Sequence, residues 1–268
     1  MINFKIILNV LGYLLVALSI LLIIPIVIDL ISGNDSWKSF LISLIITFGF
    51  GVTFLLSTRN ELKNKILTQD AFLITTLSWI FISVFGALPF FFSDSSLSLT
   101  NSIFESMSGI TTTGSTIFNK VENLPQGILI WRSILQWVGG VGIIVMAVSI
   151  LPVLQVGGMQ VFRTESSDTT DKILPRTTQI ASAVILIYII LTVTCLIAYW
   201  VGGMNLFDAI VHSMTTIATG GFSSKNDSFA SFNNASLEYI SIIFMILSSL
   251  PILVYLEITR EGLKKALA

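Results

Sequence analysis

Long apolar runs alternate with short polar segments along the whole chain. Six of the runs approach the roughly 20 residues that a helix needs to cross the hydrocarbon core of a bilayer. The predicted spans are Phe4–Leu30, Phe40–Ser57, Ala71–Phe92, Gln126–Val156, Gln179–Val201 and Leu237–Leu256. Two further elements, Asn101–Thr111 and Met204–Thr216, are too short to cross at 1.5 Å per residue, and we expect each to be a half-membrane helix. The pattern predicts an all-α polytopic membrane protein.

The composition supports the same class of protein. Hydrophobic residues make up 54% of the 268 residues and charged residues 11%, against roughly 25% charged in a soluble domain. The net charge of −1 provides no basic surface for a nucleic-acid partner. The single cysteine, Cys195, cannot form an intrachain disulfide, and the single histidine, His212, excludes the common zinc clusters. The first apolar run is too long for a cleaved signal peptide and lacks a cleavage site, so we expect a retained helix.

Each short apolar element leads into a loop rich in glycine and threonine. The first is the stretch Ser106–Ser115, read SMSGITTTGS, and the second is Ala218–Phe222, read ATGGF. Irregular backbone survives in a membrane only where protein buries it or where it lines a water-filled cavity. Threonines that end in glycine can turn successive carbonyl groups toward one axis, where they replace the hydration shell of an ion. The predicted ion-binding residues are Thr111, Thr112, Thr113, Gly114, Ala218, Thr219 and Gly220.

The two loops belong to a repeat of span, half-helix, loop and span. The predicted offset is 106 residues (220 − 114), and it pairs Gly114 with Gly220, Thr113 with Thr219 and Ser106 with His212. Both units have the same orientation, which favours parallel repeats about an axis along the membrane normal. A half-helix that points inward places its negative dipole end near that axis, where it favours a cation.

This repeat divides the chain into three parts. Residues 1–66 form an extra helix pair, residues 67–176 the first unit with a cytoplasmic loop, and residues 177–268 the second unit with the C-terminal tail. We refer to the last two parts as the first unit and the second unit.

The basic residues segregate between the predicted sides of the membrane. Ten lie on one side, namely Lys5, Arg59, Lys63, Lys65, Arg163, Lys172, Arg176, Arg260, Lys264 and Lys265. Four lie on the other, namely Lys38, Lys120, Arg132 and Lys225. The positive-inside rule therefore predicts cytoplasmic termini and glycine-rich loops that face outward. In the same arrangement Trp37, Trp131 and Trp200 fall near the outer interface, as an aromatic belt would.

Two charged residues near the first loop have alternative interpretations. Ser102 and Glu105 fit the capping box S-x-x-E, which explains Glu105 without a functional role. Arg132 lies about two turns inside its predicted span, where its side chain could snorkel to the outer interface. It could equally pair with Glu105 and brace the first half-helix. The sequence leaves both readings open.

Other polar and glycine positions have structural and functional readings. His212 is either a hydrogen-bonded packing residue or a pH sensor, and Asp208 is expected to cap the second half-helix. The glycines at 139, 140 and 142 permit close helix approach or form a gating hinge. No nucleophile–base pair, metal cluster or phosphate-binding loop stands out, and we expect a protein that is not an enzyme.

The sequence contains four blocks in this order: FESMSGITTTGSTIF, LPQGILIWRSILQWVGGVGIIVM, GGMQVFRTESSD and ATGGFSS. With these blocks the chain resembles the Trk/Ktr/HKT family of potassium transporters, and most closely its TrkH-type bacterial potassium-uptake branch. The resemblance covers nearly the whole chain. It implies a channel-like fold of membrane–pore loop–membrane units behind an extra helix pair, here Phe4–Ser57. It also implies that Gly114 and Gly220 are the filter glycines, and that glycine at the first position favours potassium where serine favours sodium.

The resemblance carries expectations about assembly and location. The family has four pore loops, and this sequence contains two, as the N-terminal half of a family member would. We therefore expect K⁺ uptake across the bacterial inner membrane with two further pore units, from a second polypeptide or from self-association. The family implies a dimer with cytosolic nucleotide-binding regulatory subunits, and no cofactor beyond the transported K⁺. The alternative function is a non-conducting remnant or an accessory membrane subunit.

The predicted orientation can be tested with an impermeant thiol reagent on intact cells. Cysteines introduced at Lys63 and Ser167 should be shielded, because both positions lie in predicted cytoplasmic loops, and one at Ser228 should be labelled. Labelling at Lys63 from outside would overturn the orientation.

Overall fold

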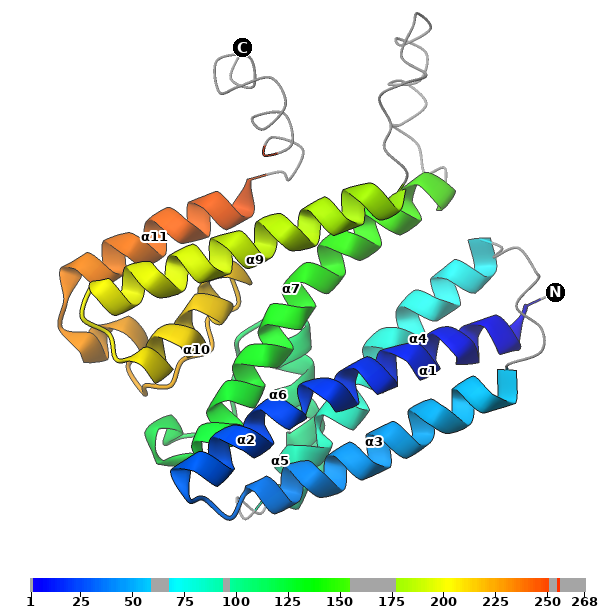
Figure 1. The fold of residues 1–268 in the computed structure, drawn as a ribbon, viewed down its shortest axis with the longest axis horizontal. Helices are drawn as coiled ribbons and strands as arrows, with labels where there is room; N and C mark the ends of the chain where they lie inside the picture. The colour runs from blue at the N-terminus through cyan, green and yellow to red at the C-terminus, as the bar shows by residue number, and fades with distance from the viewer. Residues whose placement is uncertain (1, 59–67, 94–96, 155–176, 251–254, 256–268) are drawn as a thin grey trace, which may run out of the picture.

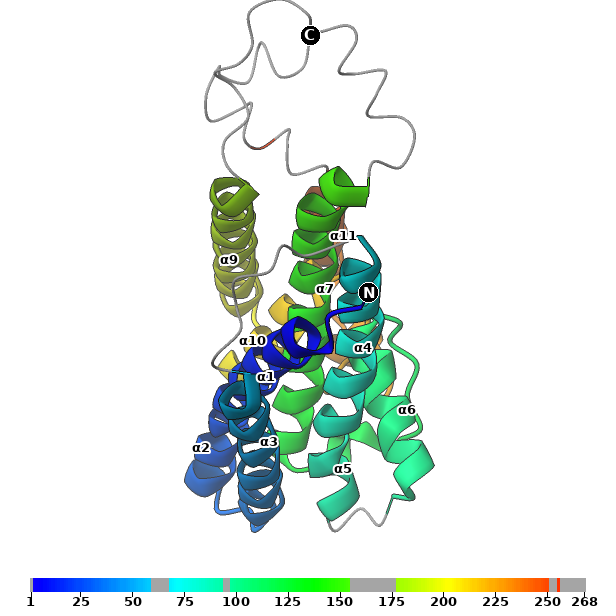
Figure 2. The same cartoon turned by 90° about the vertical axis from the view of Figure 1, so that its right-hand side faces the viewer.

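The computed structural model describes residues 2–58, 68–93, 97–154, 177–250 and 255, and every regular element in these ranges is a helix. Figure 1 shows three bodies: the extra helix pair, the helices of the first unit, and the helices of the second unit. Figure 2 shows the long helices α4 (Thr68–Gly86), α7 (Gln126–Leu154) and α9 (Thr177–Val201) with their axes roughly aligned, and α7 runs in the opposite direction to the other two. This arrangement agrees with the predicted all-α architecture.

The extra helix pair is an antiparallel hairpin. Helix α1 (Phe4–Leu21) continues as α2 (Ile23–Ser32), and α3 (Trp37–Thr58) returns alongside them. The helix breaks at Leu22, shortly before Pro25. In a straight helix the proline ring would clash with the carbonyl group four residues earlier. Gly33 makes the turn with a left-handed φ of 69°, which glycine adopts without steric cost.

The first unit contains the helices that surround the first loop. They are α4 (Thr68–Gly86), α5 (Leu88–Phe92), α6 (Leu99–Ile110), the 3₁₀ turn η1 (Val121–Asn123) and α7 (Gln126–Leu154). The predicted span over 71–92 is thus divided after Gly86, and Pro89 lies in the first turn of α5, where its missing N–H has no cost. Helix α6 is the predicted first half-helix, shifted by two residues at its start.

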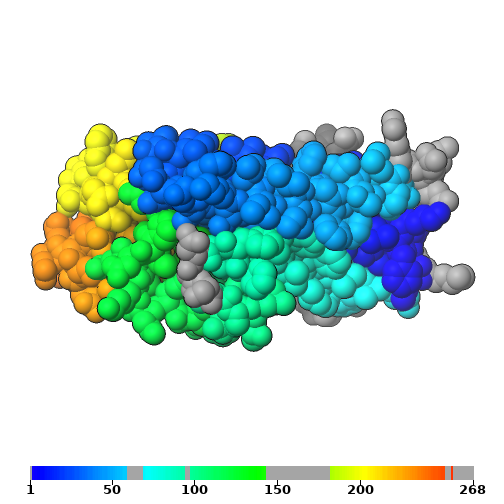
Figure 3. All heavy atoms as spheres, turned by 90° about the horizontal axis from the view of Figure 1, so that it is seen from below, coloured from blue at the N-terminus to red at the C-terminus, as the bar shows by residue number. Residues whose placement is uncertain are grey.

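The second unit repeats this order. Its elements are α9 (Thr177–Val201), the half-helix α10 (Leu206–Ile217), the 3₁₀ turn η2 (Ser228–Phe232) and α11 (Ala235–Ser249). Helix α7 contacts α6 on one side and α9 and α10 on the other, so it lies between the two units (Figure 1). Seen from below in Figure 3, the yellow and orange second unit lies against the green and cyan first unit, and the blue helix pair runs along one side of the first unit.

The structure corrects the register of the repeat by one residue. The half-helices match from Leu99 to Leu206 and from Ile110 to Ile217, which is 107 residues in each case (206 − 99 and 217 − 110). The predicted offset of 106 is therefore wrong. In the observed register, Gly114 corresponds to Gly221. The same shift pairs Glu105, rather than Ser106, with His212.

Both predicted helix caps are wrong as well. The Ser98 hydroxyl accepts the Asn101 N–H at 3.2 Å and caps α6, so Ser102 lies a full turn inside the helix and makes no capping box with Glu105. In α10 the Asn205 side chain accepts the N–H of Asp208 at 2.8 Å, which makes Asn205 the cap. Each capping residue has the extended backbone that an N-cap requires.

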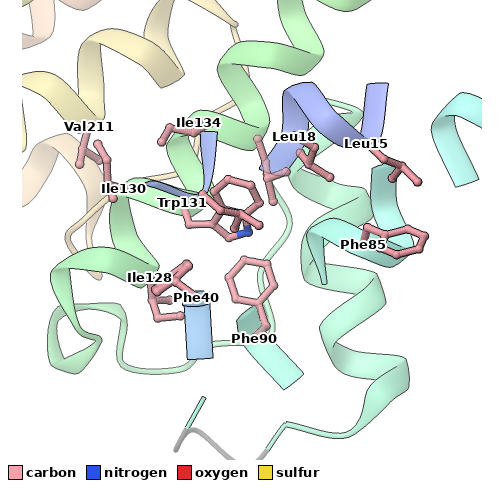
Figure 4. Packing of buried hydrophobic residues seen from close by; sticks show 12 residues of the cluster. Leu15, Leu18, Phe40, Phe85, Phe90, Ile128, Ile130, Trp131, Ile134 and Val211 are labelled. Carbon is pink, nitrogen blue, oxygen red and sulfur yellow. The ribbon is translucent and has the colours of Figure 1, made fainter. Parts of the chain in front are cut away.

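Trp131 lies in the hydrophobic core rather than at an interface. Its side chain is fully buried, and its indole Nε1–H donates to the Gly86 carbonyl oxygen at 2.9 Å. Figure 4 shows the ring next to Phe40 and Phe90. The Phe40 ring packs edge-on against it, with a centroid distance of 6.4 Å. The prediction that Trp131 belongs to an aromatic belt is therefore wrong, because a helix from the extra pair covers this face of α7.

Four helices among the described residues are long and apolar enough to cross a membrane, namely those over Phe4–Ser32, Trp37–Thr58, Gln69–Phe92 and Ser182–Val201. Helix α7 has 29 residues, and α11 has 15 residues up to the edge of a range that lies outside the described residues. The count of six spans stays a prediction. The predicted cytoplasmic loop over 161–176 and the C-terminal tail also lie outside the described residues.

A buried carboxylate joins the extra helix pair to the first unit. Asp29 on α2 has no exposed surface, and its Oδ1 accepts the N–H of Gly127 at 2.7 Å in the first turn of α7. Next to it, the Ser32 hydroxyl donates to Gln126 Oε1 at 2.6 Å. A carboxylate at the start of a helix satisfies an unpaired N–H group and interacts well with the helix dipole.

The contact between Asp29 and the start of α7 predicts that a substitution at Gly127 lowers the stability of the protein. A Cβ at Gly127 would overlap the Asp29 carboxylate, whereas one at Gly49, in the middle of α3, would meet nothing within 4 Å. Gly127→Ala should lower stability by about 1–3 kcal/mol, as overpacking does, while Gly49→Ala should be neutral or stabilising because alanine favours a helix. Thermal unfolding in detergent measures both. Equal melting temperatures for the two variants would contradict the joint.

Candidate functional site

The two glycine-rich loops share an alternating backbone. After the cap residue Thr111 (φ −84°), Thr112 and Gly114 have φ values of 56° and 78°. The second loop repeats this order with Ala218 at −73°, Thr219 at 51° and Gly221 at 83°. Alternation of right-handed and left-handed residues turns successive N–H groups to one side of the chain.

The first N–H groups of each loop donate to carbonyl groups of the loop's own half-helix. In the first loop, the N–H of Thr112 donates to Gly109 O at 2.9 Å and that of Thr113 to Ser108 O at 3.0 Å. In the second loop, Gly220 N–H donates to Thr215 O at 2.9 Å in the same way. These bonds satisfy carbonyl groups that a helix C-terminus otherwise leaves unpaired. They also place the N–H side of both loops against the helix ends.

The two loops lie against each other at a glycine. A Cβ at Gly114 would overlap the carbonyl oxygen of Gly220. The left-handed φ of Gly114 independently favours glycine. Two separate constraints, one on backbone conformation and one on space, therefore exclude a side chain at this position.

An ion pair lies behind both loops. Arg132 Nε on α7 donates to Glu105 Oε1 on α6 at 2.7 Å, and the two side chains are 2% and 0% exposed. Glu105 also accepts the Thr116 hydroxyl at 2.9 Å and the Ile117 N–H at 3.0 Å, just after the first loop. The carboxylate thus ties the half-helix to the segment that leaves the loop, in agreement with the brace interpretation rather than the snorkel.

Arg132 also contacts the second loop. Its Nη1 donates to the Ser223 carbonyl oxygen at 3.1 Å, and its guanidinium carbon lies 4.1 Å from the centre of the Phe222 ring. Cation–π contacts of this kind are favourable, more so where water is excluded. One guanidinium therefore connects the two loops.

Gln136 is a site residue that the sequence analysis missed. It follows Arg132 by four residues, so both side chains emerge from the same face of α7. Its Nε2 donates to Gly220 O at 2.9 Å, and its Oε1 accepts the Phe222 N–H at 3.1 Å. The available signal was the i, i+4 pair of polar residues inside an apolar run.

Comparisons with known proteins match this arrangement to one family. The family model described as "TrkH: Cation transport protein" matches residues 36–260. The chain belongs to the TrkH family. The predicted resemblance to TrkH-type proteins is thereby confirmed, and the family description, cation transport, is consistent with the expectation of a protein that is not an enzyme.

Several TrkH-family relatives are similar over nearly the whole chain. The Trk system potassium uptake protein TrkH of Halomonas elongata is 42% identical over 262 residues, which is 97% of this chain and 54% of the relative. TrkH of Escherichia coli K12 is 41% identical, over 92% of this chain and 51% of the relative. The crystal structure of the potassium transporter TrkH from Vibrio parahaemolyticus superposes with a TM-score of 0.84 at 34% identity, over 97% of this chain and 53% of that one. The chain spans about half the length of the curated relatives it matches.

His212 occupies the position in α10 that Glu105 holds in α6. Its Nδ1 shares a hydrogen bond with Asp208 O at 2.8 Å, and its Nε2 one with the Ser223 hydroxyl at 2.9 Å. Ser223 in turn corresponds to Thr116, the partner of Glu105 (223 − 116 = 107). The ring also packs edge-on against Phe229. These contacts agree with the packing interpretation of His212, and its role as a pH sensor stays a prediction.

Asp208 lies in the first turn of α10 and binds the segment beyond the second loop. Its carboxylate accepts the Ser224 hydroxyl at 2.5 Å and lies 3.9 Å from Lys225 Nζ. These residues line a pocket of about 320 Å³ beside the loops, together with Glu122 and Gln126 of the first unit. Asp208 therefore holds the residues that follow the second loop, Ser224 and Lys225, against α10.

Two of the three glycines near the middle of α7 allow close approach. A Cβ at Gly139 would overlap the carbonyl oxygen of Ile110 at the end of α6. A Cβ at Gly140 would lie 2.5 Å from the Tyr188 hydroxyl and 3.1 Å from the Ala218 Cα. Gly142 has no such neighbour within 4 Å, so close packing explains the first two glycines and leaves the third without a structural reason.

The buried ion pair predicts a strong and coupled effect on stability. Arg132→Ala and Glu105→Ala should each lower the free energy of unfolding by about 3–5 kcal/mol, because each strands a buried charge. The double variant should lose less than the sum of the two. Denaturant unfolding in detergent measures the cycle.

A matched control is available at the surface. Lys38 and Asp35 also form an ion pair, at 2.6 Å, but their side chains are 60% and 78% exposed. Lys38→Ala should change stability by less than about 1 kcal/mol, because solvent screens exposed pairs. Strictly additive losses for Arg132 and Glu105 would argue against the brace.

Proposed function

We propose that this chain supplies two pore loops of a K⁺ uptake pathway across the bacterial inner membrane. The observation that carries the proposal is the alternating backbone of both loops. With their N–H groups bound to the half-helices, the carbonyl groups are directed to the other side, where they can replace the hydration shell of a cation. The negative dipole ends of α6 and α10 lie at the same place and favour a positive ion.

The ion-binding residues of the first loop are Thr111 to Gly114. In the second loop we assign Ala218 and Thr219, while the Gly220 carbonyl oxygen already accepts a hydrogen bond from Gln136. The filter glycine of the second loop is then Gly221 instead of Gly220, because it shares the register and the left-handed φ of Gly114. Gly220 has the structural role of the contact between the loops.

Potassium is the proposed ion for two reasons. The relatives carry the name of potassium uptake proteins, and Gly114 is the residue type that the Trk/Ktr/HKT resemblance associates with K⁺.

The assembly is proposed to need two further pore loops. Two loops surround only half of an ion, and the relatives are about twice as long as this chain. We propose that a second polypeptide supplies the missing loops. The alternative source is a second copy of the chain, and in that case the chain alone would be sufficient for transport. We further propose cytoplasmic termini and a cytosolic nucleotide-binding regulatory subunit on that side. A non-conducting remnant is not favoured, since both loops retain their backbone and their buried supports.

The proposal predicts that the chain transports K⁺ only together with two further pore loops. The chain alone should not restore growth at low K⁺ to a bacterium deficient in potassium uptake, whereas co-expression with a matching second half should. In the restored strain, Gly114→Ser should weaken the preference for K⁺ over Na⁺, measured by ion-specific uptake. Gly49→Ser, the same change at a position with free space, should not. Robust rescue by the 268 residues alone would show that a second polypeptide is unnecessary.

A further inference from the structure

The amide of Gln136 brackets one residue of the second loop. The side chain is fully buried, and it donates to the Gly220 carbonyl oxygen at 2.9 Å while it accepts the Phe222 N–H at 3.1 Å. The two bonded groups lie on either side of Gly221. Gln136 therefore fixes both peptide groups that meet at Gly221, the residue whose left-handed φ of 83° completes the alternation of the loop.

The chemistry of the side chain matters here. A carboxamide is both a donor and an acceptor, whereas an ionised carboxylate only accepts and an aliphatic chain does neither. Rotation of the Gly220–Gly221 peptide would break the bond to Nε2 and leave buried polar groups without partners, at a cost typical of such groups. The amide thereby stabilises the orientation of this peptide in which the Gly220 carbonyl group points toward Gln136.

The same peptide lies next to the first loop. Gly114 lies so close to Gly220 O that a Cβ would overlap it, and that Cβ would lie 3.6 Å from Gln136 Nε2. In the first loop, the Thr113 hydroxyl is bonded within the loop, to that of Thr111 at 2.8 Å. The first loop is thus held by its own unit, and the second is held by α7 of the neighbouring unit.

We propose that Gln136 is a positioning residue that sets ion selectivity by fixing the Gly220–Phe222 backbone against Gly114. It does not touch the ion. It acts through the orientation of one peptide and through the distance between the two loops. The inference rests on the proposed function only in its selectivity part, since the positioning part can be measured on the chain alone.

The positioning part is tested by hydrogen–deuterium exchange of the full chain in detergent. Gln136→Leu should increase uptake in peptides that cover 219–223 and leave those that cover 111–117 unchanged. Gln136→Glu, which keeps an acceptor for the Phe222 N–H, should give a smaller increase there. Ser133→Ala is the matched control, because Ser133 is equally buried on α7 and its hydroxyl donates to Leu129 O of its own helix. Unchanged uptake over 219–223 in Gln136→Leu, or an increase throughout the protein, would overturn the positioning role.

The selectivity part is tested by K⁺ and Na⁺ uptake with a matching second half. Gln136→Leu should lower the K⁺ to Na⁺ ratio about tenfold, the factor that corresponds to one hydrogen bond of about 1.4 kcal/mol. Ser133→Ala should keep the ratio of the unmodified chain. An unchanged ratio in Gln136→Leu would refute the selectivity role. Failure of the unmodified chain to transport K⁺ would instead refute the proposed function, and the exchange experiment would still decide the positioning role.

Discussion

The structure depends on the need to satisfy backbone polar groups in two irregular loops inside an apolar helical body. Lipid cannot bond an N–H or carbonyl group, so such backbone needs partners from protein or from a water-filled cavity. The loops meet this need in part by folding N–H groups, such as those of Thr113 and Gly220, back onto the last carbonyl groups of their half-helices. The positive φ values at Thr112 and Thr219 accompany this turn in both loops.

The same need explains why one face of α7 carries charge and amide groups in an otherwise apolar helix. Burying an arginine and a glutamate costs desolvation free energy, and only good geometry with further hydrogen bonds offsets it. Glu105 meets the condition with bonds from Arg132, Thr116 and Ile117, and the guanidinium completes its own set with a carbonyl of the second loop. The helix that links the units is therefore also the support of both loops, and its glycines let α6 and α10 approach.

Features with a clear period or length could be predicted from the sequence, and features that depend on a partner in space could not. The half-helices and loops follow from two short polar interruptions in apolar runs, and the pairing of Glu105 with Arg132 was among the readings. The predicted offset between the two units was wrong by one residue. Gly220 and Gly221 are adjacent, so the sequence alone cannot say which of them corresponds to Gly114. The burial of Trp131 depends on Phe40, ninety-one residues earlier in the chain (131 − 40), and the S-x-x-E pattern at Ser102 competed with a true cap one turn before it.

The corrected register also reveals an asymmetry between the units that has a physical reason. Equivalent positions carry Glu105 in α6 and His212 in α10, and each binds the hydroxyl that follows its loop. A second carboxylate at 212 would need a second buried cation, because Arg132 already serves Glu105. The guanidinium nevertheless reaches Ser223 O, so the second loop needs no cation of its own. An imidazole, with one ring nitrogen on Asp208 O and the other on the Ser223 hydroxyl, can make both hydrogen bonds in its uncharged form. One ion pair thus serves two loops, and the repeat can be symmetric in backbone while it differs in side-chain chemistry.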